Sequence, residues 1–368
     1  MADDGWEWVS SLRDRVRGFL EKLRSNSRPE FYRYSLSGDL HGEERHWGLG
    51  NTVFAVKILY TLGDIEKMAS PRKKKLADFI TSFQRADGLI SDPLIYRLSL
   101  LNNIKHAVRT FDFSNINGVK TGRAETRQSM SSLQLLGEKP KFLFADIPYT
   151  PEGVDRFLAA LDWSDPWSAG SHFSHLLFFY EYNAEVFGYR PAESRELISW
   201  AIDYVNRMQS KHEGVWYRGT GTSLQLKING AMKILTGLKA AQRMSFSYPE
   251  RMIDLVLSAL NDEHSCDNFN IVLVLKYANE MTGGSHRLAE IQDFCRRRLL
   301  IYRQYYHPDV GGFSFYKGRS NTTYYGARIT KGLNEPDIHG TCLFLWGIAL
   351  ITQILGVQEQ FGLQEFTA

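Results

Sequence analysis

Cysteine is scarce in this sequence of 368 residues. The three cysteines, Cys266, Cys295 and Cys342, are scattered, and none belongs to a Cys-x-x-Cys pair. An odd and scattered set predicts neither a disulfide framework nor a cysteine zinc cluster. A reducing compartment fits this usage, so we expect a cytoplasmic protein.

Neither sign of charge is in excess. The chain has 44 lysines and arginines against 41 aspartates and glutamates, a formal net charge of +3. Proteins that bind nucleic acid usually present a strongly basic surface to the phosphates. The sequence therefore predicts no nucleic-acid partner.

Long hydrophobic segments are also missing. The longest apolar run extends from Cys342 to Ile351, which is shorter than the eighteen or so residues of a membrane span. The first residues, MADDGWEWVSSLRDRVRGFLEKL, lack the basic start and continuous apolar run of a signal peptide. We expect a soluble protein, or one that is peripherally associated with a membrane.

The N-terminal segment has the pattern of an amphipathic helix. Apolar residues recur at helical spacing from Trp6 to Leu23, with several arginines elsewhere on the surface. We expect residues 1–30 to form a helix packed on the body of the protein. The alternative is a basic helix that contacts an anionic membrane surface.

A layout with a polar start, an apolar helix and a glycine stop occurs six times. The terminal glycines are Gly63, Gly137, Gly188, Gly237, Gly283 and Gly356. In the middle of the chain they follow one another at intervals of about fifty residues, which suits a repeated pair of helices. The two longer intervals leave room for inserted loops at Arg97–Arg123 and Gly312–Pro336.

More polar helical segments lie between these copies and begin with Ser-Pro, Thr-Pro or Pro-Glu signals. Six apolar inner helices alternating with amphipathic outer helices predict an all-α fold, an (α/α)6 toroid, over residues 31–368 as a single domain. An open helical solenoid is the structural alternative.

Three turns carry a recurring motif of glutamine, a short spacer and glycine. Gln209, Gly214 and Trp216 match the pattern Gln, spacer, Gly, any residue, Trp, whereas Gln84 with Gly88 and Gln304 with Gly312 match in part. In this motif the sequence resembles the squalene-cyclase, terpene-cyclase and protein-prenyltransferase β-subunit superfamily of helical toroids. The resemblance implies that the glutamine bonds a neighbouring helix end and that the aromatic residue packs on it.

The segment from Gly311 to Gly347 is similar to the final repeat of the same superfamily, in which a Gly-Gly-Phe turn and a loop precede an Asp, His, Thr helix start. The Asp-any-Asp-Asp proton donor of the cyclases is absent from this sequence. Asp337, His339 and Cys342 resemble the zinc ligands of the prenyltransferases, but the preceding repeat lacks an Asp-any-Cys pair. We therefore expect no cofactor, since the ligand spacing supports neither zinc nor magnesium.

Charged and amide-bearing side chains gather at the expected inner-helix starts. Asp337 beside His339 is the best acid–base pair, and Glu125 is second. The substrate-binding candidates come from several repeats and from the loop Lys317–Pro336, whose basic residues could close over an anionic group. They are Asp39, His41, Trp47, Asn51, Arg127, His172, His175, Trp216, Tyr217, Arg319, Tyr325 and Arg328.

Ordinary structural roles explain part of this set equally well. Asparagine and aspartate are common helix caps, histidines 172 and 175 can be hydrogen-bonded core residues, and most aromatic residues pack in cores. Asp39 and His41 repeat the Asp-any-His spacing of Asp337 and His339, and a closed ring would bring these two segments together.

Three functions remain open. The resemblance favours an enzyme that acts on a lipid-like isoprenoid substrate by acid–base or electrostatic catalysis. The polar helix starts favour a carbohydrate-active enzyme, such as a hydrolase, lyase or epimerase. The missing catalytic motif leaves a non-catalytic toroid that binds a small molecule. The sequence does not indicate an oligomeric state.

Overall fold

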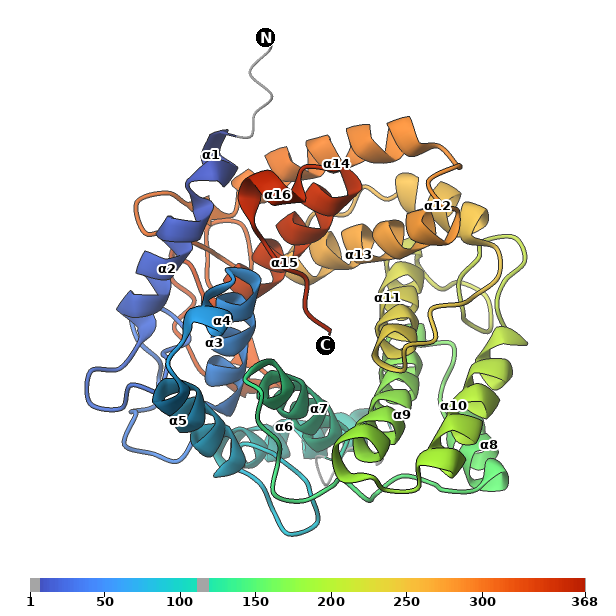
Figure 1. Ribbon diagram of the computed structural model, residues 1–368, viewed down its shortest axis with the longest axis horizontal. Helices are drawn as coiled ribbons and strands as arrows, with labels where there is room; N and C mark the ends of the chain where they lie inside the picture. Colours follow the sequence, from blue (N-terminus) through green and yellow to red (C-terminus); the bar gives the residue numbers. More distant parts are fainter. Residues whose placement is uncertain (1–6, 111–118, 368) are drawn as a thin grey trace. The chain divides into compact units, whose positions relative to one another are not determined.

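The computed structural model describes residues 7–110 and 119–367, and helices dominate this part of the chain. The helices are α1 (Glu7–Ser10), α2 (Leu12–Leu23), α3 (Leu49–Thr61), α4 (Asp64–Lys67), α5 (Ser70–Thr81), α6 (Pro93–Thr110), α7 (Val119–Leu135), α8 (Pro151–Ala159), α9 (Pro166–Phe187), α10 (Pro191–Asn206), α11 (Leu224–Ala240), α12 (Pro249–Leu257), α13 (Ser265–Met281), α14 (Leu288–Arg303), α15 (Ile338–Ile354) and α16 (Gln358–Phe361) (Figure 1). The strands form two antiparallel hairpins, β1 (Tyr306–His307) with β2 (Gly312–Phe313) and β3 (Thr323–Tyr324) with β4 (Ala327–Arg328). The prediction of a helical fold is confirmed, and the hairpins are added to it.

The chain divides into two compact units. Unit 1 comprises Met1–Phe142, Glu263–Cys266 and Arg297–Phe366, and unit 2 comprises Leu143–Asp262, Asp267–Arg296 and Thr367–Ala368. Unit 1 therefore contains both the first and the last helices of the chain. The single domain predicted over residues 31–368 would include both units, and it stays a prediction.

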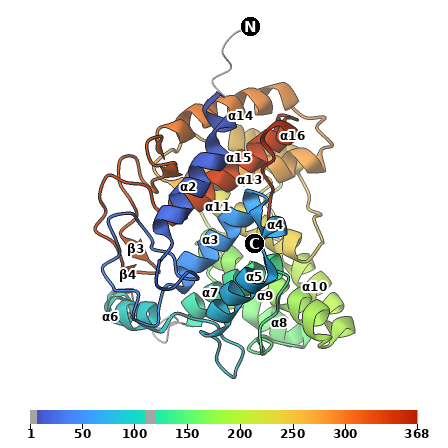
Figure 2. The same ribbon diagram turned by 60° about the vertical axis from the view of Figure 1, so that its left-hand side comes forward.

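Unit 1 is centred on α3 and α15, which pack against each other (Figure 2). Helix α3 also contacts α4, α5 and α7, and α15 contacts β2 and α16. Almost every side chain of α15 is buried, including Phe344, Trp346 and Ile348. A helix that is apolar on all sides is stable in water only when its neighbours enclose it, so α15 is the core of unit 1.

Unit 2 is held together by the contact of α9 with α11, with α10 on α9 and α8 on α10 (Figure 1). Glycines permit the close approach of α9 and α11. A Cβ atom at Gly237 would lie 2.8 Å from the Cα of Ser174, and one at Gly230 would lie 2.6 Å from the Cβ of Pro166. Larger residues at these positions would force the two helices apart.

Five of the six predicted glycine stops are confirmed. Gly63, Gly137, Gly188, Gly283 and Gly356 follow α3, α7, α9, α13 and α15 with φ between 58° and 74°. This left-handed conformation ends helices and favours glycine. The stop at Gly237 is wrong, because α11 continues to Ala240 and this glycine serves the contact with α9.

The glutamine turns have the same local structure in both units. In unit 2, Gln209 Nε2 donates to the carbonyls of Gly214, at 2.7 Å, and Ser247, at 2.5 Å, just before α12. In unit 1, Gln84 Nε2 donates to the carbonyls of Gly88 and Phe142, at 3.2 and 2.7 Å. Each glutamine therefore closes its own turn and fastens it to another segment of its unit.

Helix α2 packs on the rest of unit 1 through its apolar side. Its buried residues include Leu12, Val16 and Phe19, and it contacts β2. Its arginines also bind the body, since Arg13 Nη2 donates to the Leu62 carbonyl at 2.7 Å and Arg17 pairs with Asp64. Membrane contact through this helix stays a prediction, and it would have to use the charged side.

No helix in residues 7–110 and 119–367 has the length and hydrophobicity needed to cross a membrane.

The expected loop at Arg97–Arg123 is wrong for most of its length. Helix α6 extends to Thr110 and α7 begins at Val119. Residues 111–118 of this segment lie outside the described residues.

The expected loop at Gly312–Pro336 is organised by the β3–β4 hairpin. Tyr325 and Gly326 form its two-residue turn, with φ of 45° and 80°. Two consecutive positive φ values match the twist of a tight hairpin, although a tyrosine seldom adopts one. The hairpin therefore fixes the position of the Tyr325 side chain, which is partly exposed.

Gly311 gives a test of how α2 packs against the rest of unit 1. It has φ of 99°, and a Cβ atom there would lie 2.1 Å from the Arg15 carbonyl oxygen. We expect Gly311→Ala to lower the free energy of unfolding in urea by about 3 kcal/mol, because backbone strain and a clash with main-chain atoms add. The control is Gly137→Ala, where φ is 74° but no atom of the described chain lies within 4 Å of the added Cβ, and where a loss of about 1 kcal/mol is expected. Equal losses in the two variants would contradict the close contact.

Candidate functional site

The predicted catalytic residues Asp337, His339 and Glu125 all lie in unit 1, and His339 and Glu125 each belong to one of two neighbouring groups of side chains. The His339 cluster consists of Tyr34, Phe54, Phe315, Asn321 and His339. The Glu125 cluster consists of Asp92, Glu125, Arg127, Tyr324 and Tyr325. The groups meet where the rings of Phe54 and Tyr324 approach, with centroids 6.0 Å apart.

Asp337 is the cap of α15 and is fully buried. Its Oδ1 accepts the N–H of Gly340 at 2.8 Å, and its Oδ2 accepts those of Phe315 and Asn321 at 2.8 and 3.0 Å. Burial raises the pKa of Asp337 to about 7, while these donors oppose the shift by favouring the charged form. Both oxygens are engaged in holding the helix start and the loop before it, and a catalytic role for Asp337 stays a prediction.

His339, two residues further on, lies among aromatic rings. Its ring stacks on Phe54 with centroids 4.4 Å apart and packs on Phe315 at 4.9 Å. Its Nδ1 lies 3.1 Å from the Tyr34 hydroxyl, to which Asn321 Nδ2 donates at 3.1 Å. Asn321, Tyr34 and His339 therefore form one chain of hydrogen-bonded side chains.

The segment with Asp39 and His41 lies beside the last repeat, as the sequence predicts. Asp39 pairs in an isolated bridge with Thr330, and the Leu40 N–H donates to the Ile329 carbonyl at 2.8 Å. Asp39 Oδ1 accepts the Tyr34 N–H at 2.8 Å, and burial raises the pKa of Asp39 to about 7.

Asn51 joins the same segment to α3. Its Nδ2 donates to the Tyr32 carbonyl at 2.9 Å and to Asp39 Oδ2 at 3.4 Å. The bonds of Asp39 and Asn51 organise the chain around them, and their role in substrate binding stays a prediction.

Asp92, which is not among the residues predicted from the sequence, is a second buried cap. Its Oδ2 accepts the N–H groups of Gly48 and Leu49 at the start of α3, and its Oδ1 accepts those of Leu94 and Ile95 in α6. Four such donors favour a charged carboxylate, even though burial raises its pKa. One fully buried side chain therefore fixes the starts of two helices.

Glu125 lies next to Asp92 but is bonded very differently. It is 2% exposed, and its Oε2 accepts the Asp92 N–H at 3.1 Å. Its Oε1 is buried and has no hydrogen-bond partner among the described residues. Burial, and then the charge of Asp92, raise the pKa of Glu125 well above its ordinary value. Of the two carboxyl groups, Asp92 thus keeps the charge and Glu125 keeps the proton.

Arg127 and Tyr325 complete the Glu125 cluster. Burial lowers the pKa of Arg127 to about 9, which leaves it a cation at neutral pH, and Tyr325 partly offsets the shift. Burial raises the pKa of Tyr325, as does the nearby Glu125. The ring of Tyr325 also packs on Tyr324, with centroids 4.5 Å apart. The cluster therefore combines a buried acid, a buried cation and two neutral phenols.

The other candidates of unit 1 lie outside these two clusters. Trp47 is 1% exposed and donates Nε1–H to the Gly42 carbonyl at 3.0 Å, as a core residue does. His41 packs on Trp47, and its Nε2 lies 3.3 Å from the Arg328 carbonyl oxygen. Arg319 and Arg328 are exposed, and the Arg319 guanidinium covers the ring of Tyr316 at 4.0 Å.

The remaining four candidates belong to unit 2. His172 and His175 are both buried in α9, with ring centroids 6.0 Å apart. Trp216 is fully buried in the glutamine turn and packs on Phe246. Tyr217 donates to Glu213 Oε2 at 2.7 Å. These contacts suit structural roles, and their part in substrate binding stays a prediction.

Unit 2 also contains an amide network at the starts of α11 and α13. Asp267 accepts the side-chain amides of Asn229 and Asn261 at 3.0 and 2.8 Å. Asn229 Oδ1 in turn accepts those of Asn270 and Gln225 at 2.8 and 2.7 Å. The network joins several amide groups to one carboxylate, and Asp267 and Asn270 are buried.

Among the described residues, no three His, Cys, Asp or Glu side chains are grouped so as to hold a metal ion. Cys342 is buried in α15, and burial raises the pKa of its thiol to about 12.

The proton on Glu125 has a measurable consequence for stability. Because the folded protein keeps this proton above the ordinary glutamate pKa of about 4.3, while the unfolded chain releases it, stability falls as pH rises above that value. Glu125→Gln removes the titration, so we expect the variant to gain stability relative to the wild type between pH 5 and pH 8. Urea unfolding at several pH values measures this, and Glu44→Gln, an exposed carboxyl, is the control. A constant difference across the range would show that Glu125 is charged.

Comparison with known proteins does not name this arrangement. No protein-family model matches the sequence, and no curated protein matches it. The interpretation of the two clusters therefore depends on their own contacts, burial and charge.

Proposed function

We propose that this chain is an enzyme of an (α/α)6 toroid that acts on an isoprenoid substrate by proton transfer from Glu125. One observation carries the proposal: a buried carboxyl group that favours its neutral form has one oxygen without a hydrogen-bond partner in the described part of the chain, near two tyrosines. An acid of this kind holds its proton at neutral pH, which is the form that a proton donor to an alkene must have.

Glu125 suits this role better than Asp337. Donors from the main chain bind both oxygens of Asp337, and moving its proton would disturb the start of α15. Glu125 makes one main-chain bond and has a second oxygen for substrate. Asp337 then acts mainly by positioning the start of α15 and the loop before it.

The aromatic rings supply the second part of the mechanism. Proton transfer from Glu125 to an alkene leaves a carbocation and the Glu125 carboxylate, and this carboxylate takes a proton back when the cation forms the product alkene. Until then the faces of aromatic rings stabilise the positive charge. Phe54, His339 and Tyr325 are each partly exposed in an otherwise buried region. We propose that these rings shield the cation and that Tyr324 supports them from below through its contacts with Phe54 and Tyr325.

Arg127 supports an anionic group at one end of the substrate. A guanidinium binds phosphate oxygens through two parallel hydrogen bonds, and burial strengthens this attraction. Arg127 and Glu125 both influence the titration of Tyr325, so all three belong to one electrostatic neighbourhood. A polyprenyl diphosphate presents both the alkene and the anionic group that this pair would recognise.

The repeated glutamine turns support the toroid. Gln84 and Gln209 lie in different units yet close similar turns and fasten them in the same way. Such repetition is expected when one helix-pair unit is used along the whole chain. We propose a cytoplasmic protein, as the sparse use of cysteine favours.

The activity test uses purified full-length protein with linear polyprenes and polyprenyl diphosphates, followed by mass spectrometry of the extracted products. We expect a cyclised or isomerised product, and we expect Glu125→Gln to lower turnover at least a hundredfold, the usual range for loss of a general acid. Glu44→Gln should keep wild-type turnover. Product formation that is unchanged in Glu125→Gln would remove Glu125 from the mechanism, and absence of any product would contradict the isoprenoid substrate.

The amide network of unit 2 favours a second candidate, an enzyme that acts on a carbohydrate. Asparagine side chains and carboxylates are well suited to the hydroxyl groups of sugars, because each amide both donates and accepts hydrogen bonds. Asp267 and Asn229 are the centre of this network.

Incubation with a panel of oligosaccharides tests this candidate through the release of reducing or unsaturated sugars. We expect Asn229→Leu to abolish that release if the network holds the sugar, whereas Gln242→Leu, at a site outside the network, should not. Saturable binding of an isoprenoid or a sugar without any product would indicate the third option, a non-catalytic ligand-binding protein.

A further inference from the structure

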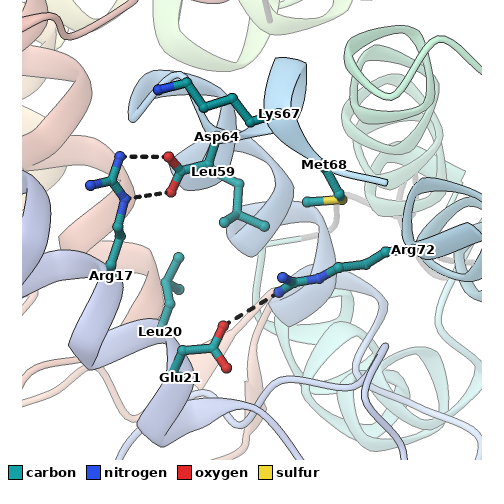
Figure 3. A pocket seen from close by; sticks show the side chains of 8 residues that line it. All are labelled: Arg17, Leu20, Glu21, Leu59, Asp64, Lys67, Met68 and Arg72. Carbon is teal, nitrogen blue, oxygen red and sulfur yellow. Dashed lines mark hydrogen bonds and ion pairs between the residues drawn. The ribbon is translucent and has the colours of Figure 1, made fainter. Parts of the chain in front are cut away.

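A pocket of about 320 Å³ lies on unit 1 between α2, α3, α4 and α5, apart from both clusters of the candidate site. Eight residues line it, and Figure 3 shows their side chains facing a common space: Arg17, Leu20, Glu21, Leu59, Asp64, Lys67, Met68 and Arg72. Its volume is in the range of small-molecule sites. Nothing in the proposed function uses this pocket.

The lining divides into an apolar middle and two charged sides. Leu20, Leu59 and Met68 lie between the pair Arg17–Asp64 on one side and the pair Glu21–Arg72 on the other (Figure 3). Lys67 adds a third cation, which makes the lining positive by one charge. Apolar surface next to excess positive charge suits an organic anion.

The two ion pairs differ in strength. Arg17 grips Asp64 with two bonds, Nε to Oδ2 at 2.8 Å and Nη2 to Oδ1 at 2.6 Å. Arg72 reaches Glu21 through Nη2 alone, at 3.4 Å, and the Glu21 side chain is 56% exposed. A single long bond of this kind contributes little, so the Arg17 pair is fixed and the Arg72 pair is easily exchanged.

Arg72 also has unused hydrogen-bonding capacity. Its Nε is buried and has no acceptor among the described residues, and its second bond, to the Tyr32 hydroxyl, is 3.3 Å long. A guanidinium prefers a carboxylate that takes two parallel N–H bonds. If a ligand took the place of the Glu21 carboxylate, a small rotation of the Arg72 guanidinium would let the ligand accept both Nε–H and Nη2–H.

We propose that this pocket binds a small amphiphilic carboxylate, with its carboxylate on Arg72 and its apolar part over Leu20, Leu59 and Met68. Lys67 adds long-range attraction from the rim. The proposal concerns a separate set of residues and holds whether or not the isoprenoid function is correct.

Calorimetric titration of the full-length protein with sodium octanoate tests the proposal. We expect saturable binding of one octanoate per chain, at least tenfold weaker binding of 1-octanol, and at least tenfold weaker octanoate binding in Arg72→Gln. The matched control is Arg85→Gln, because Arg85 is exposed and pairs with Asp87 outside the pocket, and this variant should bind octanoate like the wild type.

Met68→Trp gives an independent test, because it fills the apolar middle without changing the charges of the lining. We expect it to abolish octanoate binding while its circular dichroism stays that of the wild type, and this result decides the matter even where Arg72→Gln fails to fold. Absence of saturable octanoate binding, equal affinity for octanol, or wild-type affinity in a folded Arg72→Gln or Met68→Trp variant would each overturn the proposal.

Discussion

Buried carboxylates that accept main-chain N–H groups are the interaction on which unit 1 depends. Asp92 and Asp337 are each fully buried and each bind N–H groups from two different segments. The first N–H groups of a helix have no partner within the helix, so such a carboxylate satisfies them and also fixes where neighbouring segments begin. The positions of His339 and Glu125 follow from these two anchors.

The anchors also explain why the two acidic groups of the Glu125 cluster behave differently. A carboxylate surrounded by donors is stable as an anion even where water is excluded. Among the residues that the structure describes, Glu125 has one such donor, and the charge of Asp92 is close to it, so Glu125 is more stable with its proton. Asp92 is charged because it holds two helix starts, and its charge in turn keeps Glu125 in the acid form.

The local pattern of the sequence predicted much of the fold. Glycine after an apolar helix marked five real helix ends, because a left-handed residue there has a local physical cause. Gly237 has the same local pattern, but the partner that requires a glycine is Ser174 in another helix, and contacts across helices leave no mark in a short window. The same limit applies to the interval after Arg97, where the spacing of the glycines does not indicate that α6 continues to Thr110.

The candidate site was predicted in part for a similar reason. Asp337, His339 and Glu125 were selected by residue type, and the contact of the Asp39 segment with the last repeat followed from matched spacing. Tyr34, Phe54, Asp92 and Asn321 were missed, since their importance comes from partners far away in the chain. Asp92 had one usable signal, an aspartate directly before a proline at a helix start.

The turn of the β3–β4 hairpin contains a residue that is not the most stable choice for its backbone conformation. Position 325 has positive φ, where glycine or asparagine would relieve roughly 1 kcal/mol of strain. A tyrosine at this position therefore makes the turn less stable than glycine or asparagine would. Its backbone conformation sets the direction of the Cα–Cβ bond, and from there the ring packs on Tyr324.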